Sequence, residues 1–306
     1  MKQFNIKFVE KEKFWLFISF TIITIGLFFV VSKSLNSEQP LNYGIDFVGG
    51  NTFLLKVDED NMLYKTNSTK LINTIRTELE KYQLENSQIQ LSQNNEIFIK
   101  TLKVDKDITS NVIKSLKSAI GEFETLEIDF IGPSIGKKLK DQTIWIIITV
   151  SILLLAYITF RFEITFGIAA LIAVLHDGLI ILCFASIFSL EINTTFIAAL
   201  LTILGYSIND TIVIFDRIRE NIEKLKDYTS IKELTNKSLN QTLLRTINTS
   251  ITTIVVIMSL IVFGGSTIKE FCIVLLIGVI SGTYSSLCIA SPVIVKLYPK
   301  KEFINK

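Results

Sequence analysis

The sequence predicts a polytopic α-helical membrane protein that carries one small α+β domain outside the bilayer. Of its 306 residues, 49% are hydrophobic although 20% are charged, a composition that indicates apolar spans combined with one charged, water-soluble part. About six apolar runs are long enough to cross a bilayer at ~1.5 Å per residue. One long polar stretch separates the first run from the second.

These runs divide the chain into four parts. Residues 1–32 hold the N-terminus and the first span, residues 33–142 the polar domain, residues 143–297 the other five spans with a loop at 216–245, and residues 298–306 the tail. The N-terminus, the loop and the tail are rich in Lys and Arg, so the positive-inside rule places all three in the cytoplasm and the domain on the opposite side. The net charge of +2 is too small and too dispersed to indicate a nucleic-acid partner. The apolar runs are 14–31, 144–160, 164–188, 194–215, 246–263 and 270–295.

The polar domain shows the periodicities of a mixed fold. Alternation predicts strands at 51–57, 88–91, 97–102 and 123–130, and helical periodicity predicts helices at 67–83 and 107–120. The resulting order is strand, helix, strand, strand, helix, strand. This is the order of the ferredoxin-like split βαβ fold.

Two glycine-bearing motifs flank the domain, GIDFVGG at 44–50 and IGPSIGKKL at 131–139. Glycine adopts backbone angles that are closed to other residues, and proline fixes its own φ, so both motifs are expected to form tight connections or hinges. Neither motif has the spacing of a nucleotide-binding loop. The residues concerned are Gly44, Asp46, Gly49, Gly50, Gly132, Pro133 and Gly136.

The fourth apolar run contains an acid. Asn209 and Asp210 lie inside it, with Asp210 roughly five residues, or ~8 Å, from its end. An ionised carboxylate at such depth costs on the order of 2.5–3.5 kcal/mol on insertion scales, so it needs a partner, a proton or a water-filled cavity. Helical spacing places Ser207, Asp210, Thr211 and Ile214 on one face, which predicts a polar stripe. The alternative is that Asp210 only bonds a neighbouring helix.

Two further sets of residues bear on this acid. Arg245 opens the fifth run; with this cation nearby Asp210 stays ionised, and without it burial favours the protonated form. His176 and Asp177 are adjacent in the middle of the third run, where a proton-linked role and a packing role both remain open. A single histidine without clustered partners argues against a metal site, and no cofactor is expected. The chain also lacks a recognisable set of nucleophile, base and orienting residue, which argues against an enzyme.

The order of one span, a polar domain and five spans, with GIDFVGG, IGPSIGKKL and GYSINDTIVIFDRIREN (205–221) in their places, resembles the SecF branch of the bacterial SecD/SecF family. Members look like half of a resistance-nodulation-division (RND) transporter. The resemblance implies an inner-membrane protein with both termini cytoplasmic, a periplasmic domain and SecD as partner. It also implies contact with the SecYEG channel, with YidC or YajC, and with the translocating preprotein.

The implied activity is proton-motive-force-driven completion of protein export after the SecA-driven steps, with the proton gradient as the energy source. The family's intramembrane acid then matches Asp210, and its basic partner matches Arg245. Two other interpretations stay open. One is an RND-type half-transporter for a small hydrophobic solute. The other is a scaffold for SecD or insertase assembly, in which case the export that this protein assists would not respond to an uncoupler of the proton gradient.

Overall fold

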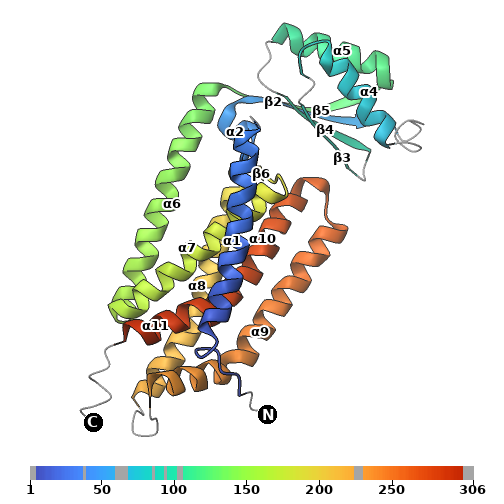
Figure 1. Cartoon of the computed structure of the whole chain (residues 1–306). Helices are drawn as coiled ribbons and strands as arrows, with labels where there is room; N and C mark the ends of the chain where they lie inside the picture. The colour runs from blue at the N-terminus through green and yellow to red at the C-terminus, as the bar shows by residue number, and fades with distance from the viewer. Residues whose placement is uncertain are drawn as a thin grey trace. The chain divides into compact units, whose positions relative to one another are not determined.

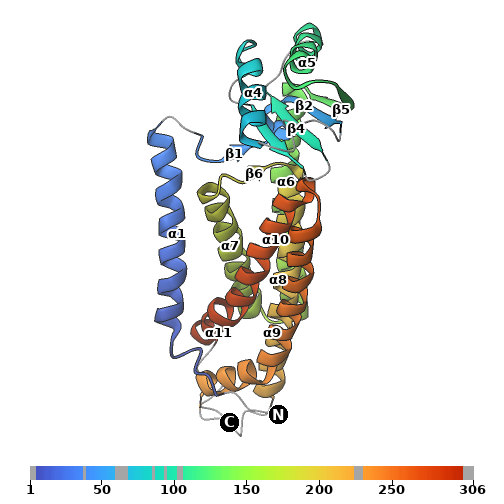
Figure 2. The ribbon, with the colours of Figure 1, turned by 90° about the vertical axis from the view of Figure 1, so that its right-hand side faces the viewer.

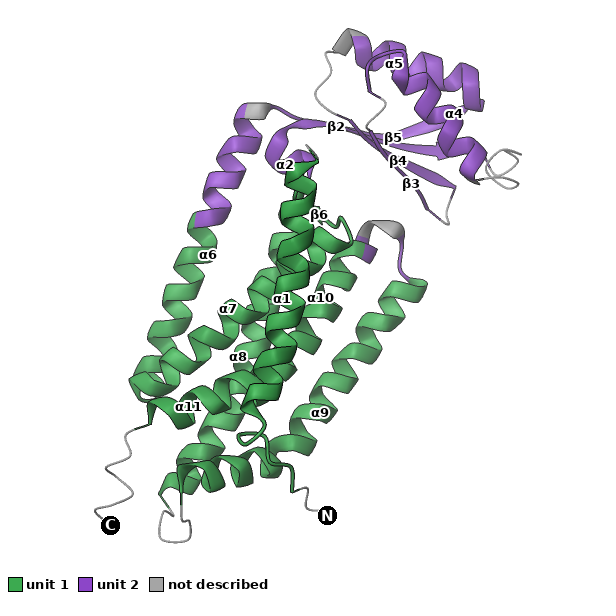
Figure 3. Cartoon of the chain, viewed as in Figure 1, with its two compact units in different colours: residues 1–42, 145–263, 270–306 green, residues 43–144, 264–269 purple. Residues whose placement is uncertain are grey.

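The computed structural model describes residues 5–36, 39–58, 68–84, 87–92, 95–101, 106–223 and 230–298. The chain forms two compact units (Figure 3). A helical unit contains residues 1–42, 145–263 and 270–306, and an α+β unit contains residues 43–144 and 264–269. The tail expected at 298–306 lies outside the described residues beyond Tyr298.

Six helical stretches among the described residues are long and apolar enough to cross a membrane, which confirms the expected polytopic α-helical class (Figure 1). The sixth stretch is continuous but changes its winding, because a π-helical turn, Ser286–Ala290, joins two α-helices. Two-residue strands, β1 (Asn42–Tyr43) and β6 (Glu191–Ile192), lie outside these helices. The helices are α1 (Glu12–Leu35), α6 (Pro133–Arg161), α7 (Ile164–Ile187), α8 (Thr194–Ile222), α9 (Ile231–Phe263), α10 (Ser266–Ser285) and α11 (Ser291–Leu297).

Small residues bring the helices close together. A Cβ on Gly26 of α1 would collide with Cys183 of α7, and a Cβ on Gly282 of α10 would lie 2.8 Å from the Cβ of Ser207 on α8. Figure 2 shows α8, α9 and α10 as neighbours. Gly282 therefore has a packing role, since close approach of membrane helices needs small residues.

The loop expected at 216–245 is the main error in the helical unit. α8 continues to Ile222 and α9 begins at Ile231, so most of the range is helical, and residues 224–229 lie outside the described residues. The extension is stabilised by tertiary contacts that a linear pattern does not show. The side chain of Asn240 accepts a hydrogen bond from the backbone N–H of Ile6 (2.9 Å) and donates one to its carbonyl (2.8 Å), while Asn236 accepts one from Val9 (3.1 Å).

The α+β unit has the expected order of elements. Helices α4 (Ser68–Glu80) and α5 (Lys106–Ile120) accompany the strands β2 (Gly50–Val57), β3 (Gln88–Leu91), β4 (Glu96–Thr101) and β5 (Phe123–Ile131). The sheet is antiparallel with strand order β3-β4-β2-β5. This confirms the ferredoxin-like arrangement. Its core comes from one face of the sheet and the apolar faces of both helices, and includes the fully buried Phe53, Leu55, Leu71, Ile75, Ile97, Ile99 and Leu116.

A charged contact joins the two helices of this unit. Lys81 donates to both carboxylate oxygens of Glu78 on α4, at 2.6 and 2.7 Å, and Ser115 on α5 donates to the same carboxylate. The hydrogen bond from Lys81, with a smaller contribution from Ser115, lowers the pKa of Glu78 below its usual range. The ionised form is therefore the one that links α4 to α5.

The glycine motifs differ in how far they match expectation. In the first motif, Gly44 precedes the short helix α2 (Ile45–Val48), which contains Asp46, and Gly49 follows it with φ 82°, a backbone angle that favours glycine. A Cβ on Gly50 would collide with the Thr101 carbonyl. This is the expected tight connection, and a hinge at these glycines stays a prediction.

In the second motif the tight connection is Gly132 alone, which joins β5 to α6, and the rest of the motif is the start of the helix. Gly132 precedes α6, Pro133 is its first residue and Gly136 lies within its first turns. Proline suits the first position of a helix because the N–H that it lacks has no partner there. Gly136 is needed for space, since a Cβ there would lie 3.0 Å from the Phe47 carbonyl oxygen and 3.2 Å from the Gly49 nitrogen. The two motifs are thus packed together within the α+β unit.

Candidate functional site

The polar stripe of α8 is buried in the helical unit. Ser207, Asp210, Thr211 and Ile214 are each at most 3% exposed, which confirms the face predicted from helical spacing. Thr211 hydrogen-bonds Ser286 of the π-helical turn at 2.8 Å. The stripe therefore faces the sixth span.

The buried carboxylate of Asp210 lacks a full set of hydrogen-bond partners among the described residues. It is 3% exposed, and its Oδ2 atom has no hydrogen-bond partner among the described residues. The positive charge of Arg245 on α9 acts on this carboxylate, and the Arg245 side chain itself is exposed. Asn209 points to the exposed surface of α8, so the structure separates it from this site. Asp210 is thus a buried acid that has one unpaired oxygen and interacts with a cation at the surface of the unit.

A second acid, Asp177 on α7, is fully buried and well satisfied. Its Oδ2 atom accepts hydrogen bonds from Ser207 of α8 and Ser285 of α10, both at 2.7 Å. Its Oδ1 atom accepts one from Ser281 of α10 at 2.6 Å and lies 3.2 Å from Nδ1 of His176. These groups form a cradle for the carboxylate, which connects three spans.

His176 extends this cradle to the first span. Its Nε2 atom lies 3.0 Å from the hydroxyl of Ser19 on α1, and Ser19 lies 3.0 Å from the hydroxyl of Tyr284 on α10. Tyr284 donates to the Trp15 carbonyl at 2.5 Å. The line from Asp177 to Trp15 is continuous and lies inside the helical unit. Among the described residues, no group of three or more His, Cys, Asp or Glu side chains could hold a metal ion.

Sequence reasoning found the two acids but missed most of their partners. Ser19, Ser281, Ser285 and Tyr284 were not predicted, because single hydroxyls in apolar helices are ordinary. One usable signal is present in the sixth span. Ser281 and Ser285 are four residues apart and alternate with Gly278 and Gly282, a spacing that places small and hydroxyl side chains along one side of the helix.

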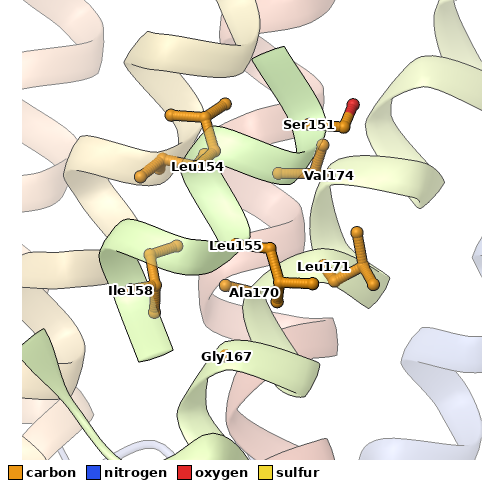
Figure 4. A pocket seen from close by; sticks show the side chains of 9 residues that line it. Ser151, Leu154, Leu155, Ile158, Gly167, Ala170, Leu171 and Val174 are labelled. Carbon is orange, nitrogen blue, oxygen red and sulfur yellow. The ribbon is translucent and has the colours of Figure 1, made fainter. Parts of the chain in front are cut away.

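A crevice between α6, α7 and α8 carries no comparable chemistry (Figure 4). Ser151 is its one polar side chain, and the Ser151 hydroxyl donates to the Ile147 carbonyl of its own helix at 2.8 Å. The candidate site therefore consists of the buried acids. The crevice is lined by Ser151, Leu154, Leu155, Ile158, Gly167, Ala170, Leu171, Val174 and Ile208.

Comparison with known proteins assigns the chain to a family. The sequence model described as "Protein export membrane protein SecD/SecF, C-terminal" matches residues 111–300, which include both acids, Arg245 and the serine cradle. This chain belongs to the SecD/SecF family. The "SecD/SecF GG Motif" matches residues 38–60, which contain Gly49 and Gly50.

Relatives within the SecD/SecF family cover nearly the whole chain. The protein translocase subunit SecF of Sebaldella termitidis is 36% identical, over 95% of this chain and 91% of the relative. The SecF subunits of Calditerrivibrio nitroreducens and Borreliella burgdorferi are 38% and 37% identical over 94% and 93% of this chain, and over 92% and 95% of those proteins. The chain is therefore a multi-pass membrane protein of SecF type.

Solved SecDF structures share the fold. The crystal structure of SecDF from Thermus thermophilus, described as a translocon-associated membrane protein, is 32% identical with a TM-score of 0.80. SecDF in its super-membrane-facing form is 31% identical with a TM-score of 0.70. The matches cover 96% and 99% of this chain but only 38% and 40% of those chains. This chain thus spans about two-fifths of the SecDF polypeptides that it matches.

Proposed function

We propose that this chain is the SecF subunit of a bacterial protein-export complex. With a SecD partner it uses the proton-motive force to complete translocation through SecYEG after the SecA-driven steps. The observation that carries the proposal is Asp210, a buried carboxylate with an unpaired oxygen and one nearby cation, Arg245. No cofactor is invoked. The membrane potential supplies ~2.3 kcal/mol per charge per 100 mV, which is enough to bias a conformational equilibrium.

The membrane-facing surface supports a partner subunit. Polar side chains are exposed on the spans α8 and α9, including Asn209 on α8 and Arg245, Asn248 and Thr252 on α9. Polar groups in contact with lipid hydrocarbon are costly, and in membrane proteins such groups are commonly covered by another helix. A SecD-type subunit seated here would cover the Arg245 side chain and would share control of Asp210. YidC, YajC and the preprotein belong to the same proposal.

The orientation is also part of the proposal. The N-terminal segment bonds the start of α9 through Asn236 and Asn240, and Lys296 of α11 lies 3.3 Å from Glu12 of α1. These three segments therefore meet at one end of the helical unit. Their Lys and Arg content favours the cytoplasmic side of the inner membrane, with the α+β unit in the periplasm.

Gradient-dependent translocation in inverted membrane vesicles tests the proposal. Asp210→Asn and Arg245→Met are each compared with wild type at equal SecF and SecD levels and with ATP held constant. Asp216→Asn is the matched control, because Asp216 lies on the same helix but is 41% exposed. We expect Asp210→Asn to abolish the stimulation by the proton gradient and Asp216→Asn to keep it. Full stimulation in assembled Asp210→Asn vesicles would instead support a scaffold.

A further inference from the structure

The contacts of His176 restrict where hydrogens can lie. The Trp15 carbonyl can only accept, so Tyr284 donates its single hydroxyl hydrogen there, at 2.5 Å. Tyr284 must then accept from Ser19, whose single hydrogen is used in that bond (3.0 Å). Ser19 must in turn accept from Nε2 of His176, also at 3.0 Å. With every contact made as a hydrogen bond, His176 therefore carries a hydrogen on Nε2.

The other side of the ring then needs a second hydrogen. Nδ1 of His176 lies 3.2 Å from Oδ1 of Asp177, and a bare nitrogen facing a bare carboxylate oxygen would be repulsive. One hydrogen must lie between them, on the nitrogen or on the oxygen. Both forms, imidazolium with carboxylate or imidazole with carboxylic acid, hold one proton more than a neutral histidine beside an ionised aspartate. Both are neutral overall, which suits a pair that is at most 9% exposed inside a membrane.

We propose that His176 and Asp177 form a proton-binding site of the helical unit that is separate from Asp210. The pair takes one proton from water and returns it to water, and no bond between heavy atoms forms or breaks. The three serine hydroxyls on Asp177 stabilise its charge when that proton leaves. This site goes beyond the role proposed for Asp210 and Arg245.

The groups around the pair come from every packed helix. From α10 this is the phenol of Tyr284, which in turn interacts with the thiol of Cys288 in the π-helical turn, and on α8 the next acid beyond Ser207 is Asp210. The first span presents the hydroxyl of Ser19, while its charged residues lie at its two ends. Exchange of one proton at the pair is therefore the main charge change at this point of the helical unit.

Loss of the proton has a structural consequence. The remaining ring hydrogen is then best placed on Nδ1, where it bonds the Asp177 carboxylate, and Nε2 becomes an acceptor. Ser19 turns its hydrogen to Nε2 and no longer donates to Tyr284. The Ser19–Tyr284 hydrogen bond between α1 and α10 thus exists only in the protonated state, whereas the bond from Tyr284 to the Trp15 carbonyl of α1 persists in both states. Proton occupancy at α7 therefore changes one of these two contacts between the first and sixth spans.

Nitrogen NMR of the full chain in lipid bilayers tests the site directly. The chain has a single histidine, so labelling histidine with ¹⁵N reports on His176 alone when the purification tag contains no histidine. We expect a protonated Nε2 at neutral pH and a change to the Nδ1–H form, with bare Nε2, as the pH is raised. An Nδ1–H ring with bare Nε2 at neutral pH, or nitrogen signals that do not change with pH, would overturn the proposal.

Two variants move the titration in opposite directions. Tyr284→Phe removes the acceptor of Ser19 in the protonated state only, so the midpoint should fall by about one pH unit, a tenfold loss of proton affinity. Tyr206→Phe is the matched control, because the buried Tyr206 hydroxyl has no partner among the described residues; its midpoint should stay in place.

Ser281→Ala removes a donor from the carboxylate, so it weakens the deprotonated state more and should raise the midpoint. Unchanged midpoints in both Tyr284→Phe and Ser281→Ala would refute the linked hydrogen-bond line. These readouts need no export activity, so they stand apart from the vesicle test of Asp210.

Discussion

Replacement of Gly282 by alanine is expected to push α8 away from α10 and to destabilise the helical unit. The added Cβ would lie 2.8 Å from the Cβ and 3.1 Å from the Oγ of Ser207, and ordinary contacts begin at 3.4 Å. The Cβ of Ser207 is fixed to its backbone, so the helices themselves must separate. Overpacking costs about 1–3 kcal/mol, and the gain in helix propensity from glycine to alanine recovers only ~0.5–1 kcal/mol. A net loss of about 1 kcal/mol follows from these two terms.

Thermal unfolding in lipid nanodiscs measures this loss. Cys183, Cys272 and Cys288 are free and buried, so a thiol-reactive dye reports their exposure as the unit unfolds. Gly205→Ala on α8 is the matched control, because nothing lies within 4 Å of a Cβ there. We expect Gly282→Ala to unfold roughly 2–4 °C below wild type and Gly205→Ala to unfold at or above it. Equal unfolding temperatures in the two variants would refute the close-packing argument.

Three further predictions concern the α+β unit and the N-terminal segment. Leu55→Ala removes a fully buried side chain and should lower the unfolding free energy, measured by hydrogen exchange of the sheet, by about 2–5 kcal/mol. Leu126→Ala, at an exposed position, should lower it by under ~0.5 kcal/mol. Similar losses in the two variants would contradict the assigned core. The hydrogen bonds of Glu78 lower its pKa, so the stability that this side chain contributes is fully present above the usual pKa range of a carboxylate. That stability is lost as the pH falls through the lowered pKa of Glu78. Glu78→Gln should therefore remove acid sensitivity from hydrogen exchange in α4, and an unchanged pH profile would count against the contact. Asn240→Ala removes both hydrogen bonds to Ile6 and should speed proteolysis of the N-terminal segment, an effect that Asn248→Ala should lack.

The sequence predicts most of the fold because its signals are local. Apolar runs mark the spans, and alternation marks the strands of the α+β unit, so each element follows from neighbouring residues. The start of α9 could not be predicted in this way, since Asn236 and Asn240 are polar and become buried and half-buried, respectively, through contacts with residues more than 220 positions away. The helical position of Gly136 could not be predicted from local patterns either. Its place in a helix is explained by the backbone of Phe47, which the sequence does not bring near.

The candidate site divides in the same way. Asp210 and its stripe are predictable, because an acid in an apolar run is unusual and helical spacing gives its face. The cradle of Asp177 is not predictable, since its donors come from two other helices and each is an ordinary serine. The separations from Asp177 to these donors range from 30 to 108 residues. Only the folded arrangement shows that the hydroxyls converge on one carboxylate.

The two acids differ in what can change their charge. Asp177 receives three hydroxyl donors and faces His176 inside the helical unit, so its state follows from how α1, α7, α8 and α10 pack. Asp210 has an unpaired oxygen, and its cation Arg245 lies on an exposed face of α9. A subunit that covers this face would change the surroundings of Arg245 and therefore the charge of Asp210, while leaving the Asp177 cradle intact. Under the proposed function, Asp210 would respond to the partner subunit and the His176–Asp177 pair to packing within this chain, so a cycle that uses both sites would link the two.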